Sequence, residues 1–302
     1  MTVLRANITN LLELGLRAVF FNQLKQYPKV YDQFLNVDDS LKQTEYDLEV
    51  VGTSAWDPVA EGLGTGYENI DEGWKTTYTH VTFRKGIRAT AEAMEDELYG
   101  VLKKASASLA RGAWQRVESD ASDLLNNAFS TTAPRGSTMA DGVALISASH
   151  VMKTGGAVQS NIISTAADLA PSSLQEVIKI LETTKDEKGI QLYMPAKKLI
   201  VATAGKFLAQ EMLGSEYKPQ TSDNEINALK AQGMTFISNP FLTDEDAWFV
   251  TSDQHQLNFL WRVKPTFFRA NDVDTQDMKC IGRMRYSLGA SGWRGIVGSA
   301  GA

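Results

Sequence analysis

The sequence has 302 residues, of which 43% are apolar and 22% are charged, proportions of an average globular chain that exclude global disorder. Its formal net charge is −6, and this acidic balance disfavours a dedicated nucleic-acid-binding protein, which usually carries a surplus of Lys and Arg. Cys280 is the only cysteine, so an internal disulfide and a metal site built on paired cysteines are excluded.

Residues 1–36 are predicted to contain a helix that ends before Pro28, because their apolar residues recur at helical spacing and Asn7 or Thr9 can cap its start. Two interpretations remain open for it: a helix packed on its own domain, or an arm packed on a neighbouring subunit or a transient partner. Charged residues interrupt its apolar stretch, which disfavours a secretory signal. No run of about 18 uncharged apolar residues occurs, so we expect no membrane span.

Residues 45–90 are predicted to form a long two-stranded excursion. Apolar residues mark an outgoing strand that contains Tyr46, Leu48 and Val50, and alternation at residues 81–88 marks a returning strand. The segment between them, residues 57–73, holds four glycines and little apolar periodicity. So long a connection is unusual in a compact domain unless it has a binding role.

Charge is sorted along this excursion. Its tip is acidic and its returning side is basic. We predict that the acidic tip of one copy binds the basic residues at the base of a neighbouring copy. The acidic residues are Asp57, Glu61, Glu68, Asp71 and Glu72, and the basic ones are Lys75, Arg84, Lys85 and Arg88. The alternative is a solvated loop whose acidic residues only aid solubility.

Residues 91–129 show the strongest helical pattern. Apolar residues step by three or four positions from Met94 to Ala128, which predicts one continuous helix of ~55 Å at about 1.5 Å per residue. Such a helix would act as a spine against which other elements pack. Because glycine weakens a helix by about 1 kcal/mol relative to alanine, we predict a bend near Gly112 in at least one assembly state.

The second half of the chain is predicted to mix helices and strands. A Gly-, Ser- and Thr-rich stretch at residues 130–170 precedes a helix that begins near Pro171, where Ser173 and Glu176 suggest a capping box. The further predicted elements are a helix at 207–213 and strands at 199–202, 236–238, 248–250 and 257–263. Their irregular alternation predicts an α+β fold rather than a doubly wound sheet.

No sequence motif assigns catalysis. The glycines of GLGTG at residues 62–66 lack the spacing and flanking elements of a nucleotide-binding loop, and no GxSxG nucleophile elbow occurs. The three histidines, His80, His150 and His255, lie far apart and form no close-spaced ligand set. We therefore predict no catalytic, cofactor-binding or metal site, and a protein that is not an enzyme.

Five stretches, spread over most of the chain, form a joint pattern. They are VTFRKGIRATAEAMEDELYG (81–100), ALISASHVMKTGGAVQSN (144–161), LYMPAKKLIVATAGKFLAQEML (192–213), NALKAQGMTFISNPFLTDEDAWFV (227–250) and RMRYSLGASGWRGIVGS (283–299). In order and spacing they resemble the major capsid proteins of tailed bacteriophages, in particular the Mu-like major head subunits and their relatives. Each stretch taken singly is only a weak match to the family, and the resemblance is specific because the five stretches occur together in this order and spacing.

The resemblance implies the tailed-phage capsid fold (HK-ninety-seven-type), which is α+β. On this mapping the chain divides into an N-terminal arm (1–40), an extended E-loop (45–90), a peripheral domain with a spine helix (91–134), an axial domain (135–250) and a return to the peripheral domain (251–302). No long charged helical region precedes residue 40, so we expect the scaffold to have been removed or to be a separate protein.

The function that the resemblance implies is structural. Many copies would self-assemble, as pentamers and hexamers, into an icosahedral shell that encloses the phage double-stranded DNA without sequence-specific binding. Expected partners are other copies of the chain, a separate scaffold, a portal and a decoration protein. The expected location is the virion, after assembly in the host bacterial cytoplasm. Two alternatives stay open: an encapsulin-like nanocompartment shell that holds a cargo enzyme, and an enzyme whose site has no linear motif.

Overall fold

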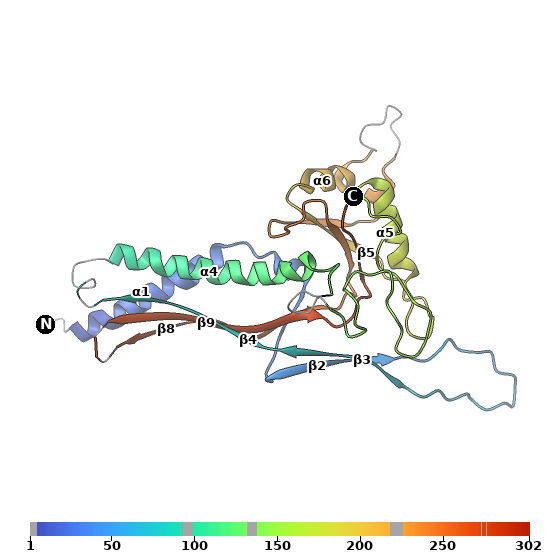
Figure 1. Cartoon of the computed structure of the whole chain (residues 1–302), viewed down its shortest axis with the longest axis horizontal. Coiled ribbons are helices and arrows are strands. Elements are labelled where there is room, and N and C mark those ends of the chain that lie inside the picture. The colour runs from blue at the N-terminus through green and yellow to red at the C-terminus, as the bar shows by residue number, and fades with distance from the viewer. Residues whose placement is uncertain are drawn as a thin grey trace.

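The computed structural model of the chain describes residues 5–90, 92, 99–131, 138–217, 226–272, 274–275 and 277–302, with side chains from residue 14 onward except that of residue 99. The fold is elongated (Figure 1). A long sheet with two long helices occupies one end, a second sheet with shorter helices stands at the other, and a two-stranded ribbon projects from their junction. The predicted α+β class is confirmed.

The long sheet has the strand order β1-β8-β9-β4. Its strands are β1 (Asn36–Asp39), β8 (Leu257–Asn271), β9 (Met278–Ala290) and β4 (Val81–Ala89). β9 lies between β8 and β4 and is antiparallel to both, whereas β1 is parallel to β8. Alternate residues of β9, among them Cys280, Met284 and Tyr286, are buried, as the two-residue period of a strand requires when one face is covered.

Helices α1 (Arg5–Gln26) and α4 (Tyr99–Asn126) cover that face. Leu16 and Phe20 of α1 are buried in one cluster with Leu109 of α4 and Phe267 of β8. Helix α1 therefore packs on its own chain, and it ends before Pro28 as predicted. Its capping prediction is wrong, because both proposed caps lie inside the helix.

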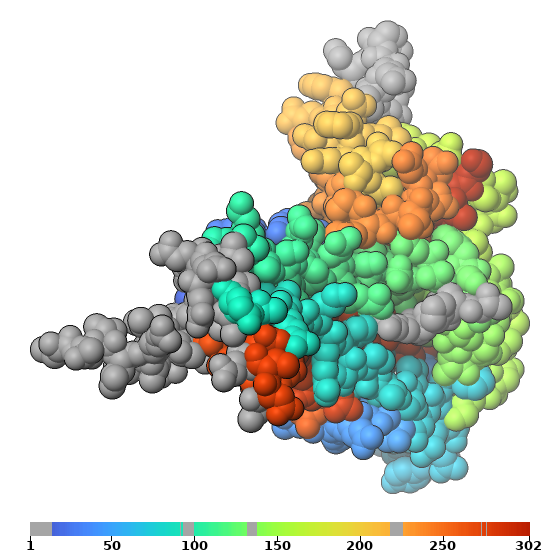
Figure 2. Space-filling model, turned by 60° about the vertical axis from the view of Figure 1, so that its left-hand side comes forward, coloured from blue at the N-terminus to red at the C-terminus, as the bar shows by residue number. Residues whose placement is uncertain are grey.

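The long helix α4 spans 28 residues, hence ~42 Å. It is unbroken over these residues, and its apolar stripe, which includes Leu102, Val117 and Leu124, is buried. The predicted start of the stripe at Met94 lies outside the described residues. The space-filling view shows α4, in green, running above β4, in cyan (Figure 2).

The second sheet has the strand order β10-β7-β5-β6, where the strands are β10 (Ile296–Ser299), β7 (Trp248–Ser252), β5 (Ala196–Ala202) and β6 (Thr235–Asn239). Helices α5 (Pro171–Thr183), α6 (Lys206–Gly214) and α7 (Ala228–Ala231) accompany it. Leu199 and Val201 of β5 pack with α5, whereas Ile200 and Ala202 belong to the other core cluster. Both faces of β5 are thus covered, which explains its continuous apolar run.

The start of α5 differs in detail from the prediction. The helix begins at Pro171, and the hydroxyl of Ser173, inside the first turn, accepts from the backbone N–H of Ala170 at 2.9 Å. Glu176 does not complete a capping box, because its carboxylate accepts from the N–H and the hydroxyl of Ser164. A local motif located the helix correctly, but tertiary contacts chose the partner of its glutamate.

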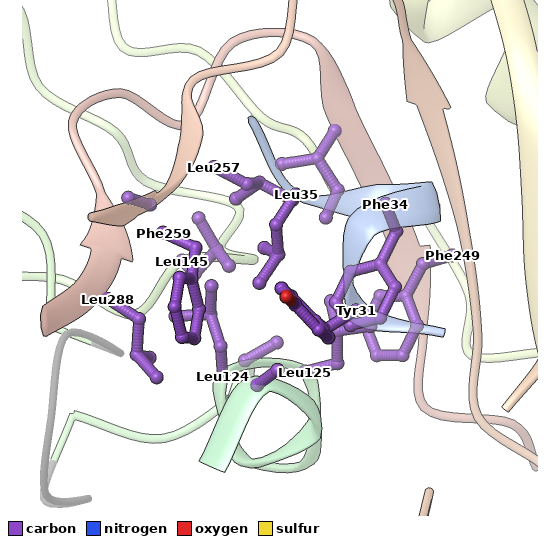
Figure 3. Close-up of a cluster of buried hydrophobic side chains, with 14 of the residues drawn as sticks. Tyr31, Phe34, Leu35, Leu124, Leu125, Leu145, Phe249, Leu257, Phe259 and Leu288 are labelled. Atoms are coloured by element: carbon purple, nitrogen blue, oxygen red, sulfur yellow. The ribbon is translucent and has the colours of Figure 1, made fainter. Parts of the chain in front are cut away.

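A large apolar cluster joins the two sheets (Figure 3). Tyr31 and Phe34 of the short helix α2 (Tyr31–Phe34) meet Leu124 and Leu125 of α4, and Phe249 of β7 closes the cluster. Burying side chains of this size stabilises a fold by roughly 1.5–3 kcal/mol each. This shared core holds the two sheets in one orientation.

The predicted return of residues 251–302 to the first sheet is wrong at its C-terminal end. β8 and β9 lie in the long sheet, but β10 pairs with β7 in the second sheet. The chain crosses over at Gly295, whose φ is +85° and where a Cβ would come within 2.9 Å of His255 Cα. Only glycine tolerates this combination without strain, so the stretch 283–299 contributes to two strands, β9 and β10, in different sheets.

The ribbon consists of β2 (Thr44–Val51) and β3 (Asp71–Thr79), paired antiparallel from Thr44 opposite Thr79 to Val51 opposite Asp71. An excursion is therefore present, but the predicted return strand is wrong. Residues 81–89 form β4, which pairs with β9 in the long sheet. The actual return strand is mostly polar, with Tyr78 as its buried aromatic residue, and the apolar alternation at 81–88 marks a different strand.

Candidate functional site

The ribbon and its loop form the candidate interaction site, and His80 anchors their base. Its Nε2 lies 2.9 Å from Ser40 Oγ and its Nδ1 lies 3.0 Å from Ser287 Oγ. Ser40 donates its hydroxyl hydrogen to Glu45 at 2.7 Å, so His80 Nε2–H donates to Ser40 and Nδ1 accepts from Ser287. Burial and then the charge of Arg285 lower the pKa of His80, which favours the neutral ring. With its proton on Nε2, the ring holds Ser40 and does not act as its base.

Further contacts attach the ribbon to residues from the second half of the chain. Arg294 binds Glu49 of β2 and also lies 3.3 Å from a carboxylate oxygen of Glu187. Lys153 Nζ donates to the backbone carbonyl of Gly73 at 2.7 Å. These contacts join three parts of the chain, so the direction of the ribbon is set by side chains that lie far from it in sequence.

The loop at the ribbon's end, residues 52–70, which we call the loop tip, extends away from both sheets (Figure 1). Trp56 and Tyr67 are 96% and 94% exposed, and Val59, Leu63 and Ile70 are exposed as well. Large apolar side chains gathered on one exposed element are typical of an interaction site. The loop tip therefore combines apolar surface with the predicted acidic charge.

The five acidic residues lie along this loop and the start of β3, and all are exposed. Glu68 accepts from the Ser54 N–H at 2.8 Å and from its hydroxyl, and these bonds lower the pKa of Glu68. Asp71 lies 4.0 Å from Lys188. Asp57, Glu61 and Glu72 form no ion pair with any described residue. The acidic residues thus lie near one another on the loop and at the start of β3, and their binding to a neighbouring copy stays a prediction.

The four basic residues are not brought together as one surface. Lys75 lies over the ring of Tyr46 within the ribbon, 4.2 Å from its centroid. Arg84, Lys85 and Arg88 belong to β4 in the long sheet, away from the ribbon. Arg88 already binds Asp277, with 2.6 Å between Nε and the carboxylate. The structure therefore places Arg84, Lys85 and Arg88 away from the acidic tip of the same chain, whereas Lys75 stays in the ribbon.

Two further arginines were missed by sequence reasoning. Arg283 of β9 lies directly opposite Arg84 of β4, and Arg285 follows two residues later. The alternation Arg-Met-Arg-Tyr at 283–286 was the available signal, because it places charged and apolar side chains on opposite faces of a strand. Only the pairing of β4 with β9 shows that Arg84 joins them.

Gly112 lines a cavity of about 630 Å³ between α4, β4 and β9. A Cβ at Gly112 would meet no atom within 4 Å. Gly112 is exposed, so the space beside it is open to solvent at the position where a bend was predicted.

The other histidines have structural surroundings. His150 is fully buried between Asp141, 2.7 Å from Nδ1, and Asn161, 3.1 Å from Nε2, and its ring stacks on Trp293. His255 is buried at the turn before β8, and burial lowers its pKa to about 4. Among the described residues no group of three or more acidic, His or Cys side chains is suited to hold a metal ion. No helix in the described part combines the length and apolar character needed to cross a membrane.

Comparison with known proteins adds a family and a fold. The family model described as "Phage capsid protein" matches residues 74–299. A search of curated proteins found no match. Among solved structures, a virus-like particle from Pyrococcus furiosus is 11% identical, with a TM-score of 0.55, over 94% of this chain and 97% of that one.

Two phage structures are similar to a comparable degree. A structure from Microbacterium phage Oxtober96 is 10% identical, with a TM-score of 0.54, over 91% of this chain and 93% of that one. The procapsid of bacteriophage JBD30 is 14% identical, with a TM-score of 0.52, over 98% of this chain and 76% of that one. At such low identity these similarities show a shared fold.

Proposed function

This chain belongs to the phage capsid protein family, and from that membership we propose that its copies assemble, as pentamers and hexamers, into an icosahedral shell around a double-stranded DNA genome. Its role as a capsid shell protein is structural. The observation that carries the proposal is the family match over residues 74–299. The ribbon supports it, because an exposed, partly apolar element that leaves its own core needs another surface, most simply that of another copy.

We assign the parts of the chain accordingly. The long sheet with α1 and α4 is the peripheral domain and α4 is its spine helix, while the second sheet with α5 and α6 is the axial domain, which includes β10. The E-loop is the ribbon and loop tip, residues 44–79, without β4. Residues 1–40 serve as the N-terminal arm, although α1 also packs on its own chain.

Contacts between copies are proposed to be many and individually modest. An exposed ion pair contributes about 0–1 kcal/mol, so no single acidic residue of the tip decides assembly. Repetition over a closed shell makes the whole slow to dissociate, because each subunit is held at several places at once.

Other partners follow from a shell of this kind. We propose a separate scaffold, a portal and a decoration protein, with assembly in the cytoplasm of the host bacterium before the chain resides in the virion. DNA inside would be held without sequence-specific binding, in line with the net charge of −6.

The deciding experiment is electron microscopy and light scattering of the purified chain over a range of concentration and salt. Capsomers, tubes or shells are expected. A monodisperse monomer under every condition would contradict the proposal and favour an enzyme without a linear motif.

A second candidate is a nanocompartment shell that holds a cargo protein. The virus-like particle from Pyrococcus furiosus shares the fold over nearly the full length of both chains, so the fold alone does not separate the two functions. Particles purified from cells in which the whole phage replicates separate the two functions. Packaged double-stranded DNA supports the phage shell, whereas a stoichiometric enzyme inside supports the nanocompartment.

We also propose that α4 bends at Gly112 in one assembly state, and the adjoining cavity supports this. Gly112→Ala fits the helix without a clash and should stabilise the unassembled subunit by about 1 kcal/mol. If the bend is needed, the same substitution lowers the yield of precursor shells. Unchanged yield and unchanged shell stability would show that the bend has no role.

A further inference from the structure

Two of the stretches in the joint sequence pattern, 144–161 and 283–299, meet in the core around His150. Its ring is fully buried, and each of its two nitrogens lies beside a side-chain oxygen. Nδ1 is 2.7 Å from Asp141 Oδ2, and Nε2 is 3.1 Å from Asn161 Oδ1. The ring also stacks on Trp293, with 4.5 Å between the ring centroids. We call these four residues the histidine latch.

The orientation of the Asn161 amide is fixed by the backbone around it. Its Oδ1 accepts from the N–H of Ser147 at 2.8 Å, and its Nδ2 donates to the carbonyl oxygens of Leu145 at 2.8 Å and Ile296 at 3.2 Å. A flipped amide would turn its N–H groups toward an N–H and its oxygen toward two carbonyls. Asn161 therefore presents an acceptor to His150, and Nε2 has to carry a proton to bond with it.

The other ring nitrogen faces a carboxyl group. A neutral ring with its proton on Nε2 would turn the Nδ1 lone pair toward Asp141 Oδ2 over 2.7 Å. Both contacts of His150 become hydrogen bonds only with one additional proton between Nδ1 and Oδ2. Asp141 Oδ1 also accepts from the N–H of Val143 at 3.2 Å, which favours the charged carboxylate and so places the proton on the ring.

We propose that His150 is a buried imidazolium ion whose charge keeps the histidine latch closed. A buried charge is costly unless it is paired and hydrogen-bonded, and here Asp141 neutralises the ring while both ring N–H groups have acceptors. The ring also lies on the face of the Trp293 indole, which attracts a cation. This device belongs to the single subunit and does not depend on assembly.

The charged groups near the latch leave this role to His150. Arg294 follows the stacked tryptophan and lies over its ring, 5.0 Å from the centroid, but it binds both Glu49 and Glu187. Its positive charge is thus offset by two carboxylates. Among the described residues, His150 is the cation that pairs with Asp141.

The latch joins segments that lie far apart in sequence. Asn161 bonds to residues 145–147 and to the crossover into β10, where its backbone carbonyl accepts from the N–H of Gly298 at 3.3 Å. The stacked tryptophan precedes Arg294, which binds Glu49 of β2. Loss of the ring charge should therefore loosen residues 145–147, β10 and the base of the ribbon together, and leave β8 and β9 ordered.

Nitrogen NMR of the full chain, with nitrogen-15 in its histidines, tests the charge directly. At pH 8 an unfolded histidine, with a pKa of about 6.5, is almost entirely neutral, yet both ring nitrogens of His150 should carry protons. His80 and His255 are matched controls in the same chain, because one nitrogen of each accepts a hydrogen bond and should be bare. His150→Gln identifies the signal, or ring contacts with Trp293 do so where that variant does not fold. A bare nitrogen on His150 at pH 8 in the folded chain overturns the proposal.

Chemical denaturation at pH 6.5 and pH 8.5 gives a second readout. The folded chain keeps a proton that an unfolded histidine loses above about pH 6.5, so this stabilisation is complete at lower pH and decreases as the pH rises. The unfolding equilibrium constant should rise by up to about 50-fold between the two pH values, since one proton gives at most about tenfold per pH unit. His150→Gln and Asp141→Asn should each remove this rise, whereas the control His80→Gln should keep it.

Hydrogen exchange over the same pH range locates the effect. Protection factors, which are corrected for the intrinsic pH dependence of exchange, should fall in residues 145–161, β10 and β2 and stay unchanged in β8 and β9. A uniform fall over the whole chain would contradict the latch. An equal rise of the unfolding constant in wild type and in folded His150→Gln would contradict it as well. Where neither substituted chain folds, the wild-type NMR spectrum decides.

Discussion

The pairs β8–β9 and β2–β3 are both long and antiparallel, yet their side chains meet different surroundings. Phe259 and Tyr286 in the first pair are buried, whereas Tyr46, Leu48 and Val50 in the ribbon are 61%, 40% and 62% exposed. An isolated two-stranded ribbon is marginally stable in water. The comparison teaches that the long sheet is stabilised within one chain, while the ribbon depends on its base and on surfaces outside the chain.

The largest effect is expected in the long sheet. Phe259 is fully buried and contacts the rings of Tyr31, Trp261 and Tyr286. Phe259→Ala should lower the free energy of unfolding by about 3–5 kcal/mol, because it removes apolar contacts and leaves a cavity. Thermal denaturation of the unassembled subunit measures this. A change below about 1 kcal/mol would mean that β8 is not part of the core.

Acid should lower the free energy of unfolding through His255, which lies just before the strand β8 that contains Phe259. The pKa of His255 falls from 6.5 to about 4 on folding, mainly through burial and then through Lys198. The pKa of His255 is lower in the folded chain than in the unfolded chain. Neutral His255 therefore stabilises the fold fully above about pH 6.5, and this contribution is lost as the pH falls through about 4. At about 1.36 kcal/mol per pKa unit the loss approaches ~3 kcal/mol.

The measurement is chemical denaturation between pH 7 and pH 4, compared with His255→Gln. The variant has no titrating ring, so its stability should fall less over this range. Equal pH dependence in the two proteins would assign the acid sensitivity to other groups.

A smaller effect is expected at the ribbon's base. Ser40→Ala removes two hydrogen bonds at the base of the ribbon. One is donated by His80 to the Ser40 hydroxyl, and the other is donated by that hydroxyl to Glu45. The net loss should be about 1–3 kcal/mol, because His80 Nε2–H is left buried without its partner. Hydrogen exchange should accelerate in β2 and β3 and stay unchanged in β8 and β9. Uniform acceleration over both pairs would show that the ribbon does not open separately.

The smallest effect on the unassembled subunit is expected in the ribbon's own strands. Leu48 is partly exposed, so Leu48→Ala should change the free energy of unfolding by less than about 1 kcal/mol. In contrast to Phe259→Ala, it should reduce particle yield while the subunit stays folded. Light scattering beside thermal denaturation separates the two, and a large loss of subunit stability would place Leu48 in the chain's own core.

Local sequence patterns predicted those helices and strands in which the buried apolar residues recur at the regular spacing of the element. The apolar steps of α4, the end of α1 before Pro28 and the apolar run of β5 fall into this group. In each, the element's period and the residues that end it are encoded within a few turns or a single strand. The acidic loop tip was predictable for the same reason, because its charge is contiguous in sequence.

Pairing between distant strands was decided only by the tertiary structure. The polar strand β3, not β4, is the partner of β2, and β10 leaves β9 for the second sheet at Gly295. Arg84 and Arg283 lie 199 positions apart in sequence, and only the β4–β9 register places them side by side. A strand's sequence shows which residues alternate, but the partner, the register and hence the surface depend on which segments fill the core together.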